Sequence, residues 1–202
     1  KNILILSIFL LSNCLTFGQD SKAKAILDKL SAETKAYASV YVEFSSKIKS
    51  TAVDESSNGT AYMKGKKFYI KTGKYTLISN GIKQWVINSE EKKVYVSDYE
   101  EDEDAITPSK ILTIWEDDFK YKYIGAGKIG TTAVENVELY PKDPGSFQFH
   151  TISMSIDTKA NKPVQIIVKS KDGSRMTYTF TKFEGNKEVS DSKFVFNKGN
   201  YP

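Results

Sequence analysis

Short segments in which apolar and polar residues alternate recur along most of this chain, and they constrain its fold more than any other feature. In the first of them, which runs from residue 40 to 48, Val40, Val42 and Phe44 alternate with Tyr41 and Glu43. A period of two sends successive side chains to opposite faces of a strand, so this pattern is typical of a half-buried β-strand. Similar segments are found at 60–64, 67–72, 75–79, 83–88, 93–97, 119–124, 132–140, 147–157, 163–169, 176–183 and 194–196.

Turn-forming residues separate these predicted strands. Asn80-Gly81 and Asp172-Gly173 are hairpin sequences, because Asn, Asp and Gly tolerate the positive φ of tight turns. The polar stretch 54–59 is also predicted as a turn. Many strands joined in order by short turns predict one domain built on a large, meander-like antiparallel sheet that curls toward a barrel. The fold class is therefore mainly β, with a small α component.

Two segments have helical periodicity. Residues 21–37 carry an apolar stripe that includes Ile26 and Leu30, surrounded by charged residues. A second helix is predicted from Thr107 through about Trp115, because Pro108 fits a first helical turn. Two short helices cover only part of such a sheet, so the remaining apolar surface must form a filled core, a dimer interface or a ligand cavity.

The first residues form a unit of their own. Lys1 precedes an apolar run from Ile3 to Leu11, and the small residues Thr16 and Gly18 precede a cleavage point before Gln19. This order is that of a signal peptide, and the run is too short to span a bilayer comfortably. We therefore expect residues 1–18 to be removed on export and residues 19–202 to form the mature domain.

Cys14 is the only cysteine, so no disulfide can form within the chain. A rival interpretation takes Leu11-Ser12-Asn13-Cys14 as a lipobox with a lipidated Cys14, although Asn13 stands where a small residue is usual. The two interpretations differ in whether the mature protein is free or anchored to a membrane.

Charge and residue chemistry argue against several classes of function. The formal net charge is +4, and it becomes +3 when residues 1–18 are removed, because they contain Lys1 and no acidic residue. This is too small to indicate nucleic-acid binding. The one histidine, His150, has no partner for a triad or a metal site, and no phosphate-binding loop is present. We expect no enzymatic activity, no metal and no cofactor.

Five segments in order resemble one known family, the periplasmic outer-membrane lipoprotein carriers, or LolA-like proteins. The most specific is Ile78-Ser79-Asn80-Gly81-Ile82-Lys83-Gln84-Trp85, which is similar to the family's Val-Ser-Asp-Gly-Lys-x-x-Trp hairpin. The other segments are Tyr41-Val42-Glu43-Phe44 after the opening helix, Gly59-Thr60-Ala61-Tyr62-Met63-Lys64, Thr107-Pro108, and Asp191-Ser192-Lys193-Phe194-Val195-Phe196. The resemblance covers the chain from about Lys24 to Phe196.

The resemblance implies a single large curled antiparallel sheet that forms an incomplete barrel, with lid helices over a hydrophobic cavity. It implies a monomeric periplasmic carrier that takes up the acyl chains of lipoproteins released from the inner membrane and passes them to an outer-membrane acceptor. The implied partners are thus acylated lipoproteins, an inner-membrane release complex and that acceptor. The alternatives are a related lipid- or glycolipid-binding protein and an acceptor anchored to the membrane through Cys14.

On this basis we expect the cavity to be lined by apolar residues of the sheet and of the second helix. The candidates are Val42, Phe44, Met63, Phe68, Leu77, Trp85, Ile87, Ile111, Leu112 and Trp115. Each could equally belong to a plain core, since an error of one residue in register inverts the face of a strand.

The chain departs from the family pattern at one position. Carriers of this family place an arginine after the lysine of the second segment, and it helps to latch the lid, whereas here Lys64 is followed by Gly65. We expect the latch to be absent or supplied elsewhere, with Lys66 and Lys67 as candidates.

Overall fold

A computed structural model describes residues 20–99 and 113–201 of the chain. The helices are α1 (Ser21–Ala36), α2 (Trp115–Asp118) and two 3-10 helices, η1 (Asp191–Phe194) and η2 (Lys198–Asn200). The strands are β1 (Val40–Lys49), β2 (Asp54–Lys64), β3 (Lys67–Thr72), β4 (Tyr75–Ser79), β5 (Lys83–Asn88), β6 (Lys93–Asp98), β7 (Phe119–Ile129), β8 (Thr132–Pro141), β9 (Phe149–Asp157), β10 (Lys162–Ser170) and β11 (Arg175–Gly185).

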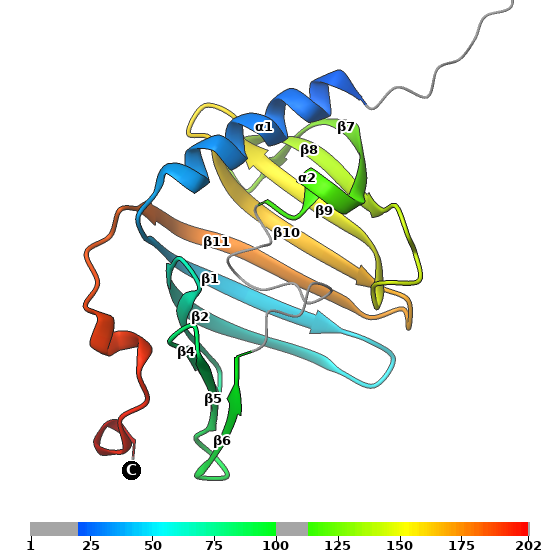
Figure 1. The fold of residues 1–202 in the computed structure, drawn as a ribbon. Coiled ribbons are helices and arrows are strands. Elements are labelled where there is room, and N and C mark those ends of the chain that lie inside the picture. The colour runs from blue at the N-terminus through cyan, green and yellow to red at the C-terminus, as the bar shows by residue number, and fades with distance from the viewer. Residues whose placement is uncertain (1–19, 100–112, 202) are drawn as a thin grey trace, which may run out of the picture.

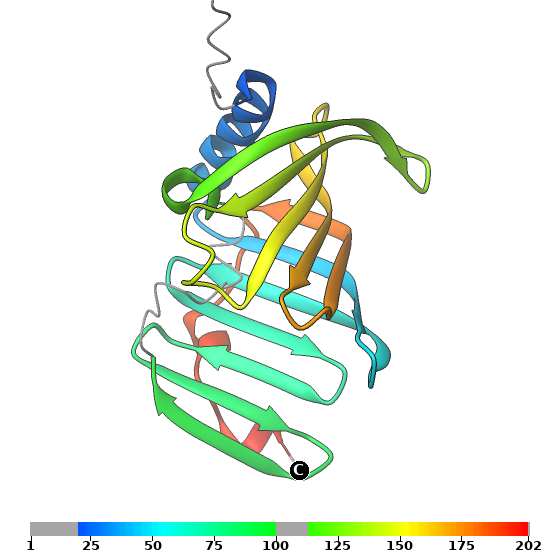
Figure 2. The same cartoon turned by 90° about the vertical axis from the view of Figure 1, so that its right-hand side faces the viewer.

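The strands form one antiparallel sheet of eleven in the order β6-β5-β4-β3-β2-β1-β11-β10-β9-β8-β7. It consists of two meanders, β1 to β6 and β7 to β11, and the first and last strands pair to join them. The sheet is strongly curled and is not closed, with β6 and β7 at its two ends (Figures 1 and 2). The predicted single curled antiparallel sheet, an incomplete barrel, is confirmed.

Helix α1 begins at a well-formed cap. The carboxylate of Asp20 accepts hydrogen bonds from the backbone amides of Lys22 and Ala23, at 3.0 and 3.1 Å, which satisfies two of the free donors of the first turn. Its second oxygen accepts from the backbone amide of Tyr123 in β7, at 2.9 Å. The same residue therefore starts the helix and fixes its position against the sheet.

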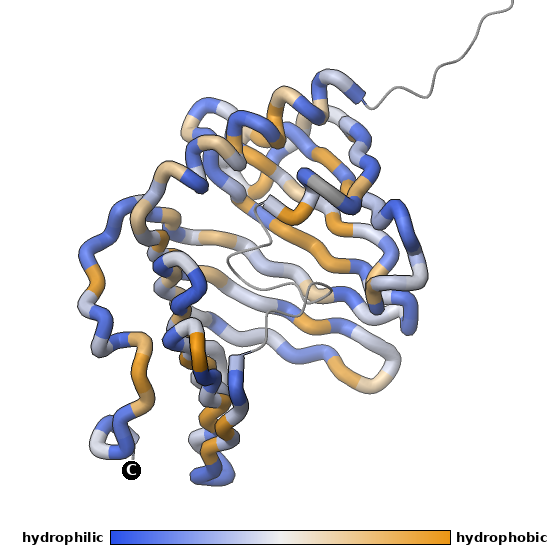
Figure 3. Tube along the Cα trace, in the orientation of Figure 1, coloured by the Kyte–Doolittle hydropathy of each residue, from blue (hydrophilic) through white to orange (hydrophobic). Residues whose placement is uncertain are grey.

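Two faces of the sheet can be distinguished by register, because residues paired across antiparallel strands point to the same side. We call the face that bears Val42 the inner face and the face that bears Tyr41 the outer face. Apolar and polar residues alternate along the strands (Figure 3). The inner face carries the main apolar core, into which α1 inserts Ala23, Leu27 and Leu30. Helix α1 contacts β7, at one end of the sheet.

The segment after β11 lies against the outer face of the first meander. Its helix η1 contacts β3, and Phe194 in that helix is completely buried. Asp191 pairs with Lys64 at 2.9 Å and with Lys67 at 3.0 Å, and the ammonium group of Lys193 lies 4.1 Å from the centre of the Tyr69 ring. This segment gives the outer face a small core of its own, separate from that of the inner face.

The two edges of the sheet differ in character. Strand β7 has a bulge at Gly125, where φ is +140°, and carries Lys120 and Lys122 at exposed positions. Lysines and bulges on an edge discourage the addition of a further strand. On β6, by contrast, Tyr95 and Val96 are exposed by 56% and 57%.

The observed secondary structure differs from the predicted one in three segments. The stretch 54–59, expected to be a turn, is the first half of β2, where it pairs with the second half of β1. The strand expected at 194–196 is wrong, because Phe194 ends η1. Most of the helix expected from Thr107 lies outside the described residues, and the described helix α2 begins at Trp115.

Candidate functional site on the inner face of the sheet

Five of the predicted cavity residues lie together on the inner face. Met63 of β2 pairs with Phe68 of β3, and Val42 of β1 pairs with Ala61 of β2, so these side chains share one side. Val42, Phe44, Met63 and Phe68 are buried members of the main apolar cluster. Leu77 of β4 is half-buried and packs against that cluster.

Trp85 and Ile87 point to the outer face instead. Trp85 pairs with Ile78, and Ile87 pairs with Thr76, whereas Leu77 pairs with Val86 on the inner face. Ile87 is buried but does not belong to the inner apolar cluster. The physical reason is the period of two: β5 presents Gln84 and Val86 to the inner face, so its alternate residues face away.

Of the three cavity residues predicted on the second helix, the structure describes Trp115. Ile111 and Leu112 lie outside the described residues. Trp115 is 5% exposed, belongs to the inner cluster and packs edge-on against Tyr121, with ring centres 5.8 Å apart. Its indole Nε1–H has no hydrogen-bond partner among the described residues. Trp115 is therefore a buried aromatic residue of the inner face with an unsatisfied polar atom.

The sequence-based list omitted several inner-face residues. Ile70 of β3 lies across from Leu77, and Met176, Tyr178 and Phe180 follow one another along β11. All four are half-buried and pack against the main cluster. Their alternation with polar residues in 176–181 was visible in the sequence. Their place beside Phe44 depends on the pairing of β1 with β11, which no local pattern specifies.

Tyr178 occupies the middle of this apolar surface. Its ring meets the Phe44 ring edge-on, with centres 6.0 Å apart. Its hydroxyl donates to the thioether sulfur of Met176 at 3.9 Å. Burial raises the pKa of Tyr178, so its hydroxyl stays protonated and remains a donor at any physiological pH.

Hydrogen bonds to the carboxylate of Glu116 connect helix α2 to α1. Glu116 accepts hydrogen bonds from the hydroxyl of Ser31 and from the ammonium group of Lys35, both in α1. Burial by itself would raise the pKa of Glu116, but these hydrogen bonds outweigh it and the pKa is lowered. Lys67, one of the two expected substitutes for the missing latch, binds Asp191 on the outer face. The hydrogen bonds between α1 and α2 thus join Glu116 to Ser31 and Lys35 and do not involve Lys67.

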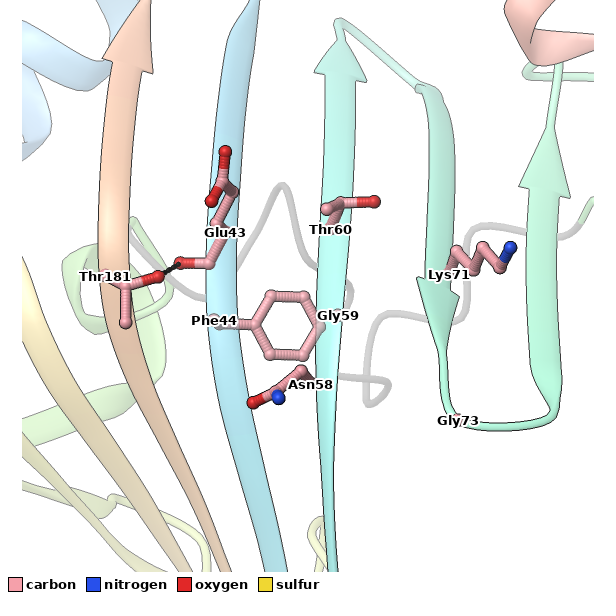
Figure 4. A pocket seen from close by; sticks show the side chains of 8 residues that line it. All are labelled: Glu43, Phe44, Asn58, Gly59, Thr60, Lys71, Gly73 and Thr181. Atoms are coloured by element: carbon pink, nitrogen blue, oxygen red, sulfur yellow. Dashed lines mark hydrogen bonds between the residues drawn. The ribbon is translucent and has the colours of Figure 1, made fainter.

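A separate hollow of about 480 Å³ lies near the junction of β11, β1, β2 and β3. Its lining includes the polar residues Glu43, Thr60 and Lys71, which the register places on the outer face (Figure 4). Of the predicted cavity residues only Phe44 borders it. This hollow is thus not the apolar cavity expected from the sequence.

Within residues 20–99 and 113–201, no group of three or more His, Cys, Asp or Glu side chains is placed to hold a metal ion. His150 has Thr151 as its neighbour, with 2.8 Å between Nδ1 and Oγ1. In the same part of the chain, no helix combines the length and apolar character of a membrane span.

Comparison with known proteins identifies the family. Residues 35–197 match the family described as outer membrane lipoprotein carrier protein LolA. The chain belongs to this family. The LolA match begins near the end of α1 and ends beyond η1, so it takes in both faces of the sheet. No sequence among the curated proteins matches the chain.

Solved structures share the fold at low sequence identity. An uncharacterized conserved protein from Thermus thermophilus superposes with a TM-score of 0.58 and 10% identity, covering 88% of this chain and 95% of that one. LprF from Mycobacterium bovis gives a TM-score of 0.51 and 14% identity, covering 85% and 96% of the two chains. At such identities the likeness shows a shared fold and no more.

Proposed function

We propose that this protein is a periplasmic carrier, exported by its signal peptide, which binds the acyl chains of lipoproteins on its inner face and shuttles them from the inner to the outer membrane. An inner-membrane release complex would load it, and an outer-membrane acceptor would unload it. Membership of the LolA family supports this proposal. Binding of this kind needs no covalent chemistry.

One observation carries the proposal: the inner face of β4, β3 and β11 presents large apolar side chains that are only half-buried. These are Leu77, Ile70, Met176, Tyr178 and Phe180. They adjoin the buried residues Val42, Phe44, Met63 and Phe68 of the same face. Each methylene of an acyl chain that leaves water contributes about 0.8 kcal/mol, so partly covered apolar surface of this extent can hold a lipid reversibly.

The test compares two substitutions of a half-buried aliphatic residue by Gln, one on each face of the sheet. Leu77→Gln alters the inner face, whereas Ile167→Gln alters a half-buried residue of β10 that pairs with Ser153 and Thr177 on the outer face. Binding of a fluorescent acyl probe to the mature chain should weaken roughly tenfold in Leu77→Gln, because apolar contact is lost. It should be nearly unchanged in Ile167→Gln. Equal affinities in the two variants would place the binding site elsewhere.

Two further measurements address the carrier role itself. Protein purified from its native envelope should carry lipoprotein, detected by mass spectrometry, whereas free lipid or glycolipid alone would favour the related lipid-binding function. The mass of the mature N-terminus decides between a free carrier and an acceptor anchored through an acylated Cys14. A protein that binds no acyl probe and carries no lipid is not a carrier.

A further inference from the structure

Two hydrogen-bond donors on the inner face lack an adequate acceptor. The indole Nε1–H of Trp115 is buried and has no partner in the part of the chain that the structure describes. The hydroxyl of Tyr178 donates to the sulfur of Met176 at 3.9 Å. A thioether sulfur is a weak acceptor for the half-buried Tyr178 hydroxyl, and a buried donor without any partner, such as the Trp115 indole, destabilises the fold. Native structures keep such groups rarely, and each one calls for an explanation.

Both donors lie on the inner face of the sheet, the face proposed above to bind acyl chains. Tyr178 pairs with Ser46 and Ile166 and contacts the ring of Phe44. Trp115 packs on Tyr121, whose partner across β8 is Leu139, a fully buried residue of the inner cluster. The two donors therefore face the same side of the sheet as the half-buried apolar residues.

We propose that the ligand supplies the missing acceptors, and that Trp115 and Tyr178 recognise the carbonyl oxygens of acyl esters or amides. This inference rests on the proposed function and adds a specificity to it: the site should prefer acylated molecules over plain hydrocarbon. A carbonyl suits these donors because it is neutral and accepts a hydrogen bond. A charged headgroup would cost far more to remove from water, and a hydrocarbon would leave the Trp115 indole unpaired and the Tyr178 hydroxyl on its weak sulfur acceptor.

The experiment measures the ratio of two affinities, one for an ester and one for a hydrocarbon. A loss of packing in a variant weakens both and cancels in the ratio. The mature protein is titrated with a long-chain fatty acid methyl ester and with the alkane of equal length, each displacing a hydrophobic dye. Trp115→Phe removes the indole donor, and Tyr178→Phe removes only the hydroxyl. One hydrogen bond corresponds to about a threefold to tenfold preference for the ester, which each substitution should reduce by that factor.

Tyr140→Phe is the matched control. Its hydroxyl donates to Glu138 at 2.5 Å, and its pairing with Lys120 belongs to the outer face. This variant undergoes the same chemical change as Tyr178→Phe but should keep the full preference for the ester. Circular dichroism of all variants verifies that they are folded.

The possible outcomes separate this inference from the function beneath it. Loss of the preference in Trp115→Phe and Tyr178→Phe, with its retention in Tyr140→Phe, supports the proposal. If the ester and the alkane bind equally well to the parent protein, or if both variants keep the preference, the donors are satisfied by bound water and the proposal is overturned while the carrier function stands. If neither ligand displaces the dye, the proposed function fails as well.

Discussion

Glu138 illustrates how a single charged residue is held in a sheet. On the outer face of β8 its carboxylate accepts hydrogen bonds from Lys169 at 2.7 Å, Ser153 at 2.9 Å and Tyr140 at 2.5 Å. Its side chain is 21% exposed. Burial by itself would raise the pKa of Glu138, but the hydrogen bonds outweigh it and hold the pKa at about 2. The charged form is thus specifically stabilised in the folded protein.

This lowered pKa predicts a particular dependence of stability on pH. Since the folded pKa lies below the ordinary value of 4.5, Glu138 stabilises the fold above about pH 4.5, and the contribution disappears as the pH falls toward 2. Replacing Glu138 with Gln should lower the free energy of unfolding by about 1–3 kcal/mol at pH 7 and by roughly half as much or less at pH 3. Urea titrations at the two pH values measure it, and an equal loss at both would show that the charge contributes nothing.

At Gly59 the sheet has no room for a side chain. A Cβ atom there would lie 2.5 Å from Cζ of Phe44 and 2.7 Å from the carbonyl oxygen of Lys71. Gly59→Ala should therefore lower the free energy of unfolding by roughly 1–3 kcal/mol, the usual range for overpacking.

Thermal unfolding of Gly59→Ala, followed by circular dichroism, measures this loss. Gly145→Ala is the control, because the nearest atoms to a Cβ there belong to the flexible carboxylate of Asp143, at 3.1 Å. A melting temperature for Gly59→Ala as high as that of the control would mean that the Phe44 ring moves aside at little cost.

For single residues, the sequence predicts the alternation of apolar and polar side chains along a strand, but it does not predict to which face of the sheet each side chain points. Leu77 and Trp85 were both assigned to one cavity, yet the register of β4 with β5 places them on opposite sides. Val86, the residue that does face Leu77, is equally apolar, so hydrophobicity could not choose between them. Only the hairpin geometry around Asn80-Gly81 fixes that choice, and a shift of one residue would reverse it.

Among the elements, the C-terminal segment with η1 depends on one side chain more than on its ion pairs. Phe194 is completely buried, whereas Asp191 is exposed and its partners Lys64 and Lys67 are partly exposed. Exposed ion pairs contribute about 0–1 kcal/mol, while replacing a buried Phe with Ala costs about 3–5 kcal/mol.

Phe194→Ala should consequently destabilise the protein several times more than Asp191→Asn. Limited proteolysis combined with urea unfolding tests this, because release of the segment exposes new cleavage sites near residue 194. If Asp191→Asn were the more damaging change, the lysine pairs and not the buried ring would hold the segment in place.

The element predictions succeeded where periodicity and turn chemistry agreed, as in β3 to β5. They failed at 54–59, where Asp54, Asn58 and Gly59 favour a turn by local propensity. Those residues extend β2 because Lys49 to Phe44 of β1 offer a pairing partner, and such tertiary context overrides propensity. Residues 194–196 were predicted to form a strand, but a helical turn and a strand cannot be told apart from the sequence in so short a segment.

In the whole molecule, stability should be distributed unevenly over the two meanders. Ile152, Met154 and Ile156 of β9, and Ile166 of β10, are at most 1% exposed, whereas all residues of β6 are exposed. Backbone amides of β9 and β10 should exchange with solvent slowest and those of β6 fastest. Hydrogen exchange followed by mass spectrometry measures this, and uniform protection would contradict it.

The curled antiparallel sheet could be inferred from the sequence, because strand after strand carries the same alternation. The joining of the two meanders through β1 and β11 could not, since Val40 and its partner Gly185 are far apart in the chain. That pairing brings the residues 176–180 beside Phe44 and so completes the candidate site. The site was therefore only half predictable, for a topological reason.

The unequal edges of the sheet have a consequence for assembly. A protein with two receptive edges can polymerise without limit, because each added copy offers a new place for the next. Here only β6 is receptive among the described strands, while lysines and a bulge guard β7. Growth by strand addition would thus end after one step, once the β6 edges of two copies have paired.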